Sequence, residues 1–242
     1  GECNTAVLGA NIVPEVGVSA LAKKTVNDYI EPYTILEKNG MNIGIIGIDI
    51  VDKTINSSSP DETTKFLDEK ETAQKYINEL ASKGIDHIIL LTHFQYKNDL
   101  NLAKDLKGVD IIVGGDSHSL LGDFSQIGLN SKGSYPTIVN NNDGNTVCVV
   151  QAWQYSQIVG ELNVEFDEEG NVKSCEGTPH LMLANSFKRK NADGDRVEIE
   201  GEARQAVLQA IEDNPSLTLT SDDPDAAALL KGFSSKVDEL KF

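Results

Sequence analysis

The chain has 242 residues, enough for one large or two small domains, with 39% hydrophobic residues and a formal net charge of −17 at pH 7. So acidic a chain is repelled by nucleic-acid backbones, and we expect no nucleic-acid partner. It has no apolar run near the ~20 residues that a transmembrane helix needs, so we expect no membrane span. A small phosphorylated ligand stays compatible with this charge, because bound metal can reverse the local field.

The first segments of the chain predict strands. Short apolar runs at residues 7–12 and 42–48 are typical of buried strands, and residues 30–36 between them predict an edge strand. Residues 52–64 are mostly polar and include Pro60, so we expect a loop there.

Helices and strands then alternate. Residues 68–83 and 99–107 have apolar side chains at helical spacing, and we expect Asp99 to cap the second helix rather than to line a cleft. Residues 88–92 and 109–113 are apolar runs typical of parallel strands that are buried on both faces. This alternation predicts an α/β fold with right-handed crossovers.

The pattern changes in the second half of the chain. Residues 135–140, 146–152 and 158–166 predict strands joined by hairpin loops at residues 141–145 and 167–171. We therefore expect this half to be antiparallel.

The last part of the chain is polar and predicts mainly helices. Residues 202–212 predict one helix, and residues 224–240 predict another, which starts at an acidic segment followed by Pro224.

The three cysteines, Cys3, Cys148 and Cys175, form no C-x-x-C pair, so a structural zinc site is not indicated. They are either three unrelated thiols or, in an oxidising compartment, one disulfide and one unpaired cysteine. We expect Cys148 and Cys175 to lie on neighbouring strands, close enough to bridge. Cys3 would then have a partner outside this chain or stay free.

Histidine and aspartate follow two of the predicted parallel strands. His93 ends one strand, and Asp116 and His118 follow the next after a pair of glycines. Each feature alone is typical of an ordinary strand end or turn. Together, at the edge where open α/β sheets bind ligands, the three side chains predict a site for a transition metal.

Several segments occur in an order typical of one enzyme family. They are Leu8-Gly9-Ala10-Asn11-Ile12, Ile43-Gly44-Ile45-Ile46-Gly47, Leu91-Thr92-His93, Val113-Gly114-Gly115-Asp116-Ser117-His118 and the strands within residues 135–162. The chain thereby resembles the second half of the catalytic domain of periplasmic and ecto 5'-nucleotidases, which are calcineurin-like metallophosphoesterases. The resemblance implies a layered α-β-β-α sandwich with mixed parallel and antiparallel sheets, incomplete here. Residues 1–183 would be the C-terminal half of that domain, and residues 184–242 a helical connector toward a nucleotide-binding domain.

The resemblance also implies two divalent metal ions, zinc, manganese or similar, that together hydrolyse a phosphoester. His93 matches the histidine that binds the second ion. Asp116 stands where the pattern Gly-Gly-His-x-His has its first histidine, so it would bind the same ion, and His118 would face the first ion. The carboxylate in place of imidazole shifts the preference toward manganese or magnesium.

The amino-terminal blocks of the family are absent from this sequence. It has no early Asp-x-His and no Gly-Asn-His-Glu or Gly-Asn-His-Asp, the blocks that supply the other metal ligands and the catalytic histidine. We therefore expect no catalytic residue in this chain. We expect an incomplete enzyme that packs against a second polypeptide carrying the missing N-terminal half, or a nicked product of one longer precursor.

The function implied is metal-dependent hydrolysis of 5'-nucleotides or related nucleotide phosphoesters, in a periplasmic or secreted protein. The alternative is a non-catalytic scaffold or binding fragment that retains the fold. A Rossmann protein is disfavoured because no Gly-x-Gly-x-x-Gly turn is present. A serine hydrolase is disfavoured because Ser117 has no general base in view.

Overall fold

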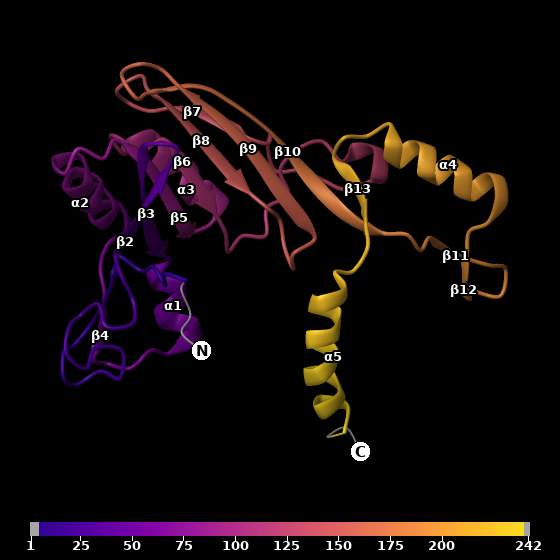
Figure 1. Cartoon of the computed structure of the whole chain (residues 1–242), viewed down its shortest axis with the longest axis horizontal. Helices are drawn as coiled ribbons and strands as arrows, with labels where there is room; N and C mark the ends of the chain where they lie inside the picture. The colour runs from indigo at the N-terminus through magenta and orange to yellow at the C-terminus, as the bar shows by residue number, and fades with distance from the viewer. Residues whose placement is uncertain (1–4, 240–242) are drawn as a thin grey trace. The chain divides into compact units, whose positions relative to one another are not determined.

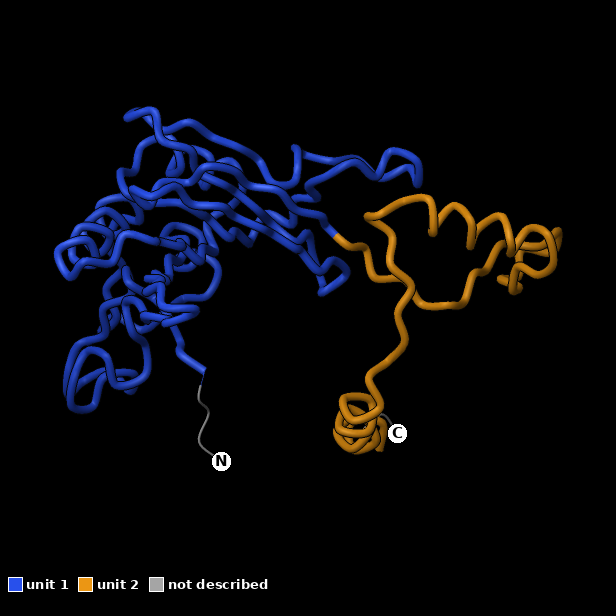
Figure 2. Tube along the Cα trace, turned by 45° about the horizontal axis from the view of Figure 1, so that its top comes forward, with its two compact units in different colours: residues 1–179 blue, residues 180–242 orange. Residues whose placement is uncertain are grey.

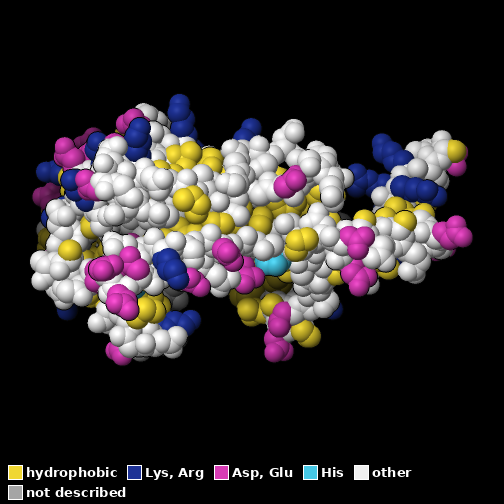
Figure 3. Space-filling view, turned by 90° about the horizontal axis from the view of Figure 1, so that it is seen from above, with side chains coloured by type: hydrophobic (Ala, Val, Ile, Leu, Met, Phe, Trp, Pro, Cys, Tyr) yellow, Lys and Arg dark blue, Asp and Glu magenta, His cyan; other side chains and the backbone are white. Residues whose placement is uncertain are grey.

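The computed structural model describes residues 5–239. The chain divides into two compact units, residues 1–179 and residues 180–242 (Figure 2). Cys3 lies outside the described residues, and what was expected of it stays a prediction. Among the residues described, no helix is both long enough and apolar enough to cross a bilayer. Figure 3 shows a face on which acidic and basic side chains are interspersed with small apolar patches.

A six-stranded mixed sheet organises the first unit, in the order β2-β3-β5-β6-β8-β7 (Figure 1). Its four central strands are parallel: β3 (Met41–Asp49), β5 (His87–His93), β6 (Ile111–Gly114) and β8 (Thr146–Gln151). The edge strands β2 (Tyr33–Lys38) and β7 (Thr137–Asn140) are antiparallel to their neighbours. The predicted α/β class with mixed sheets is confirmed. The second half is not wholly antiparallel, however, because β8 extends the parallel sheet.

Two helices, α2 (Glu69–Ser82) and α3 (Tyr96–Asp105), pack against this sheet over a continuous apolar core. One row of side chains crosses the sheet from strand to strand and is wholly buried: Ile46, Leu90, Ile112 and Val149. Burial of each such side chain stabilises the fold by about 1.5–3 kcal/mol. The core therefore fixes the positions of the strand ends.

The opposite face of the same sheet is only partly covered. Alternation along the strands places Leu36, Leu91 and Ile138 on that face, where they are 50%, 48% and 50% exposed. Strands of a parallel sheet are usually buried on both faces. This face therefore presents apolar surface on which a further layer of secondary structure can pack.

A second sheet has the order β13-β10-β9. It is formed by β9 (Ile158–Phe166), β10 (Val172–Ala184) and β13 (Leu217–Thr220). A disulfide joins Cys148 of β8 to Cys175 of β10, with their Cα atoms 6.4 Å apart. The predicted bridge is confirmed. Its two strands are not neighbours, because β8 and β10 belong to different sheets. The bond therefore ties one sheet to the other within the first unit.

Removal of this bond is expected to destabilise the first unit by about 3 kcal/mol, since it frees a loop that spans 27 residues in the unfolded chain. Urea unfolding of the oxidised and the reduced chain measures the difference. A double variant, Cys148→Ala with Cys175→Ala, serves as the control, because a reductant should not change its midpoint. An unchanged midpoint for the reduced wild-type chain would contradict this role.

The second unit contains the two predicted helices, α4 (Gly201–Glu212) and α5 (Pro224–Asp238). It also contains strands that the sequence reading did not predict: β11 (Lys188–Lys190), β12 (Arg196–Glu198) and β13. The first two form a short exposed hairpin of mostly charged residues. Such strands have no buried face, and therefore no apolar alternation to reveal them.

Two predictions near the amino terminus are wrong in detail. The strand expected at residues 7–12 is instead β1 (Ile12–Pro14), which pairs only with β4 (Thr64–Phe66) in a small separate sheet. The segment expected to be a loop contains α1 (Val51–Ser58), of which no residue is buried. A short 3₁₀ helix, η1 (Ser125–Ile127), follows β6.

Helix α1 has no buried apolar face, and tertiary hydrogen bonds hold it in position instead. The Val51 backbone N–H donates to Glu69 Oε1 at 2.9 Å, and the Thr54 hydroxyl donates to Asp49 Oδ2 at 2.6 Å. Helix propensity is low in this segment, which is rich in β-branched and short polar residues. The helix therefore depends on contacts that the local sequence does not reveal.

Candidate functional site

The parallel strands β3, β5 and β6 end at one edge of the sheet. Asp49 and His93 are register partners at the ends of β3 and β5. A glycine pair leads from β6 to Asp116, whose Oδ1 lies 3.4 Å from His93 Nε2. The structure therefore brings together two of the three predicted site residues.

His118 does not join them in a formed cluster. Its side chain is exposed, and its ring lies edge-on to Tyr155 with the ring centroids 5.4 Å apart. Across residues 5–239, no group of three or more His, Cys, Asp or Glu side chains is arranged to hold a metal ion. The role of His118 as a ligand stays a prediction.

Asp116 is a buried carboxylate with one unsatisfied oxygen. Its side chain is 3% exposed, and Oδ2 has no hydrogen-bond partner among the described residues. The Lys53 ammonium donates to Oδ1. Burial, the largest single effect, raises the pKa of the Asp116 carboxyl, but hydrogen bonds from the side chains of Lys53 and Gln95 and the nearby positive charge together outweigh it and hold the pKa below its usual value. Asp116 is therefore ionised at neutral pH.

The donor set fits one corner of a divalent-metal site. Imidazole and carboxylate bind zinc and manganese, and an ion would satisfy the buried oxygen of Asp116. In this structure the positive charge beside the Asp116 carboxylate is that of the Lys53 ammonium. Lys53 lies in the segment predicted as a loop, so no sequence signal marked it as part of the site.

A hydrogen-bond network holds the turn that carries Asp116. Gln151 at the end of β8 donates from Nε2 to the Gly115 carbonyl at 3.0 Å and accepts from the Ser117 hydroxyl at 3.2 Å. The Tyr96 backbone N–H at the start of α3 donates to Ser117 Oγ at 3.0 Å. Asp116 has a φ of +68°, which is unfavourable for a residue with a side chain. The network offsets that strain and sets the direction of the carboxylate.

A second buried carboxyl, that of Asp99, lies behind the same turn. Asp99 does not cap the helix as expected, because α3 begins at Tyr96, and Asp99 is wholly buried. It accepts a hydrogen bond from the Thr92 hydroxyl at 2.7 Å, and burial raises its pKa to about 7. A Cβ on Gly114 would lie 2.2 Å from Asp99 Oδ2, so only glycine fits at this point.

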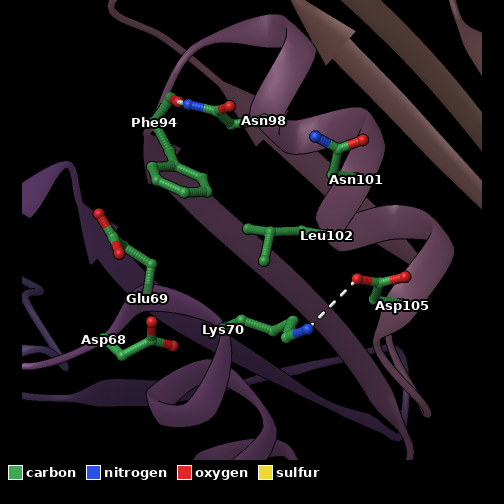
Figure 4. Close-up of a pocket in the computed structure, with 8 residues that line it drawn as sticks. All are labelled: Asp68, Glu69, Lys70, Phe94, Asn98, Asn101, Leu102 and Asp105. Carbon is green, nitrogen blue, oxygen red and sulfur yellow. Dashed lines mark hydrogen bonds and ion pairs between the residues drawn. The ribbon is translucent and has the colours of Figure 1, made fainter.

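A cavity of about 140 Å³ lies between the start of α2 and α3, next to the end of β5 (Figure 4). Phe94, which follows His93, lines it together with Asp68, Glu69, Lys70, Asn98, Asn101, Leu102 and Asp105. Its single cation is already paired, Lys70 Nζ lying 3.3 Å from Asp105 Oδ2. The carboxylates of Asp68, Glu69 and Asp105 disfavour an anion in this cavity.

The chain is similar to known nucleotidases over almost its whole length. It is 36% identical to a probable 5'-nucleotidase of Treponema pallidum and 37% identical to an NAD 5'-nucleotidase of Haemophilus influenzae, each over 97% of this chain. The solved structure of the Haemophilus influenzae NAD nucleotidase superposes with a TM-score of 0.90, at 35% identity, over 98% of this chain and 46% of that one. The chain belongs to the 5'-nucleotidase family.

The chain spans 39% and 38% of the lengths of these two 5'-nucleotidase relatives. A 5'-nucleotidase precursor of Thermus thermophilus superposes with a TM-score of 0.62 at 38% identity, over 73% of this chain and 33% of that one. No protein-family model matches the chain. The resemblance inferred from the strand-end motifs is thus confirmed for the 5'-nucleotidase family.

Proposed function

We propose that this chain contributes to the metal-dependent hydrolysis of 5'-nucleotides or related nucleotide phosphoesters. The observation that carries the proposal is the contact between His93 and Asp116 at the carboxyl edge of the sheet, with the second Asp116 oxygen buried and unpaired. Membership of the 5'-nucleotidase family supports it. The name of one relative, NAD 5'-nucleotidase, adds a dinucleotide to the candidate substrates.

In this proposal, His93 and Asp116 would hold one divalent ion, and His118 would face the other. Paired ions, zinc, manganese or similar, would supply a hydroxide nucleophile and neutralise charge on the phosphoryl group. The residues of this chain orient these ligands. Gln151 and Ser117 hold the turn on which Asp116 sits, and the buried row of the core holds the end of β5 at His93.

We propose further that residues 1–183 are the second half of a catalytic domain and that residues 184–242 lead toward a nucleotide-binding domain. The remaining ligands would come from a polypeptide with Asp-x-His and Gly-Asn-His blocks. The half-exposed Leu36, Leu91 and Ile138 support a docking face for it, since they lie on the sheet face that lacks a full covering layer.

The disulfide supports a periplasmic or secreted location, because such bonds persist in oxidising compartments. A second candidate function, that of a non-catalytic scaffold, is favoured by one observation. Among residues 5–239 no complete cluster of metal ligands is formed.

Assays of phosphate release from adenosine 5'-monophosphate in the presence of Mn²⁺ distinguish the two functions. We expect no measurable release from the 242-residue chain alone, because it carries too few ligands for two ions. We expect release when a polypeptide from the same source that carries the missing blocks is added. Metal-dependent release from the chain alone would refute the division of ligands. No release from the mixture would favour the scaffold.

A further inference from the structure

The Lys53 ammonium is paired with the carboxylate that the proposed metal ion would bind. Its ammonium donates to Asp116 Oδ1, the same oxygen that lies 3.4 Å from His93 Nε2. A metal ion bound between His93 and Asp116 would therefore meet the ammonium at close range. Two cations at such a distance repel each other.

The second oxygen of Asp116 shows that the lysine does not complete the site. Oδ2 is buried and has no hydrogen-bond partner in the described part of the chain. An unsatisfied buried acceptor destabilises the folded chain, and a charged acceptor does so more strongly. A single ammonium at Oδ1 leaves this cost in place, whereas an ion that reaches both the carboxylate and the imidazole would remove it.

Lys53 is also free to leave. Its side chain is half exposed, and it lies on α1, in which no residue is buried. Besides the bond from Lys53 to Asp116, α1 is held by hydrogen bonds of Val51 and Thr54, which do not involve the lysine side chain. The ammonium can therefore swing into solvent without unfolding the helix that carries it.

We propose that Lys53 is a built-in competitor for the divalent ion at Asp116. It neutralises the buried carboxylate when no metal is bound, and it must be displaced when the ion binds. Lys53 thereby weakens metal binding at this position and keeps it reversible. The proposal deepens the metal site proposed above and depends on it.

Titration calorimetry of the 242-residue chain with Mn²⁺ tests the proposal without any measurement of activity. Lys53→Met should tighten Mn²⁺ binding about tenfold, because the competing charge is lost, whereas Lys53→Arg should bind like the wild type. Lys70→Met is the matched control. It removes the lysine paired with Asp105, away from the site, and should leave the affinity unchanged.

Asp116→Asn separates failure of this inference from failure of the metal site. It should weaken Mn²⁺ binding, and in its presence Lys53→Met should have no further effect. Mn²⁺ binding that is equal or weaker in Lys53→Met than in the wild type would overturn the role of Lys53 and leave the metal site standing. Absence of Mn²⁺ binding in every variant, both alone and with the polypeptide that carries the missing blocks added, and with circular dichroism showing folded protein, would overturn both.

Discussion

In the assembled, active enzyme, replacement of His93 with alanine is expected to lower phosphate release from adenosine 5'-monophosphate by roughly 100-fold or more. The imidazole lies 3.4 Å from the Asp116 carboxylate at the sheet edge, and its loss would leave the second ion with too few ligands. Even residues that only support metal ligands affect activity or affinity by about 10–100-fold. Steady-state kinetics and the metal content of the purified variant measure the two consequences together.

His87→Ala is the matched control for this experiment. His87 lies at the opposite end of the same strand, and its ring stacks on Phe166 with centroids 4.3 Å apart. Its loss should lower stability and leave turnover and metal content unchanged. Normal turnover and full metal content in His93→Ala would show that His93 is not a ligand.

The parts of the site on parallel strands were predictable from the sequence. An apolar run that ends at a polar residue marks both a strand and its end. Parallel strands joined by helices have their carboxyl ends at the same edge of the sheet. This reasoning places His93 and Asp116 at one edge of the sheet, where the structure has them in contact. It did not extend to His118, because a turn of left-handed residues after the glycines determines the direction of that ring.

The parts that the sequence did not reveal depend on tertiary contacts. Lys53 reaches Asp116 from a helix that has no buried residue and is held by hydrogen bonds to Glu69 and Asp49. Aspartate is a residue typical of helix caps, yet Asp99 lies in the core. The absence of a side chain at Gly114 leaves room there for its carboxyl group. Neither position can be inferred from local propensity, because the partners are distant in sequence.

Stability of the chain is expected to fall as the pH rises from 5 to 8. Asp99 and Asp110 are both buried, and burial raises the pKa of each to about 7, from an ordinary value of 3.8. Hydrogen bonds from Thr92 to Asp99 and from the Ile88 backbone N–H to Asp110 lower these values only in part.

The sign follows from proton binding. Between the two pKa values the folded state holds a proton on each carboxyl and the unfolded state does not, so stability declines as the pH rises toward 7 and levels off above it. Each group contributes about 2.5 kcal/mol of this loss between pH 5 and pH 8, and the two together up to about 5 kcal/mol.

Replacement of Asp99 by asparagine is expected to remove about half of that pH dependence. The amide cannot ionise, so only the contribution of Asp110 should remain. Its oxygen can still accept the hydrogen bond from Thr92. The amide nitrogen lacks an acceptor where Asp99 Oδ2 now has no partner, which costs about 1–3 kcal/mol at every pH and does not change the slope. Urea unfolding with a chelator present, at several values between pH 5 and pH 8, gives the slope for each protein. Equal slopes for the wild type and Asp99→Asn would show that Asp99 does not carry a proton at neutral pH.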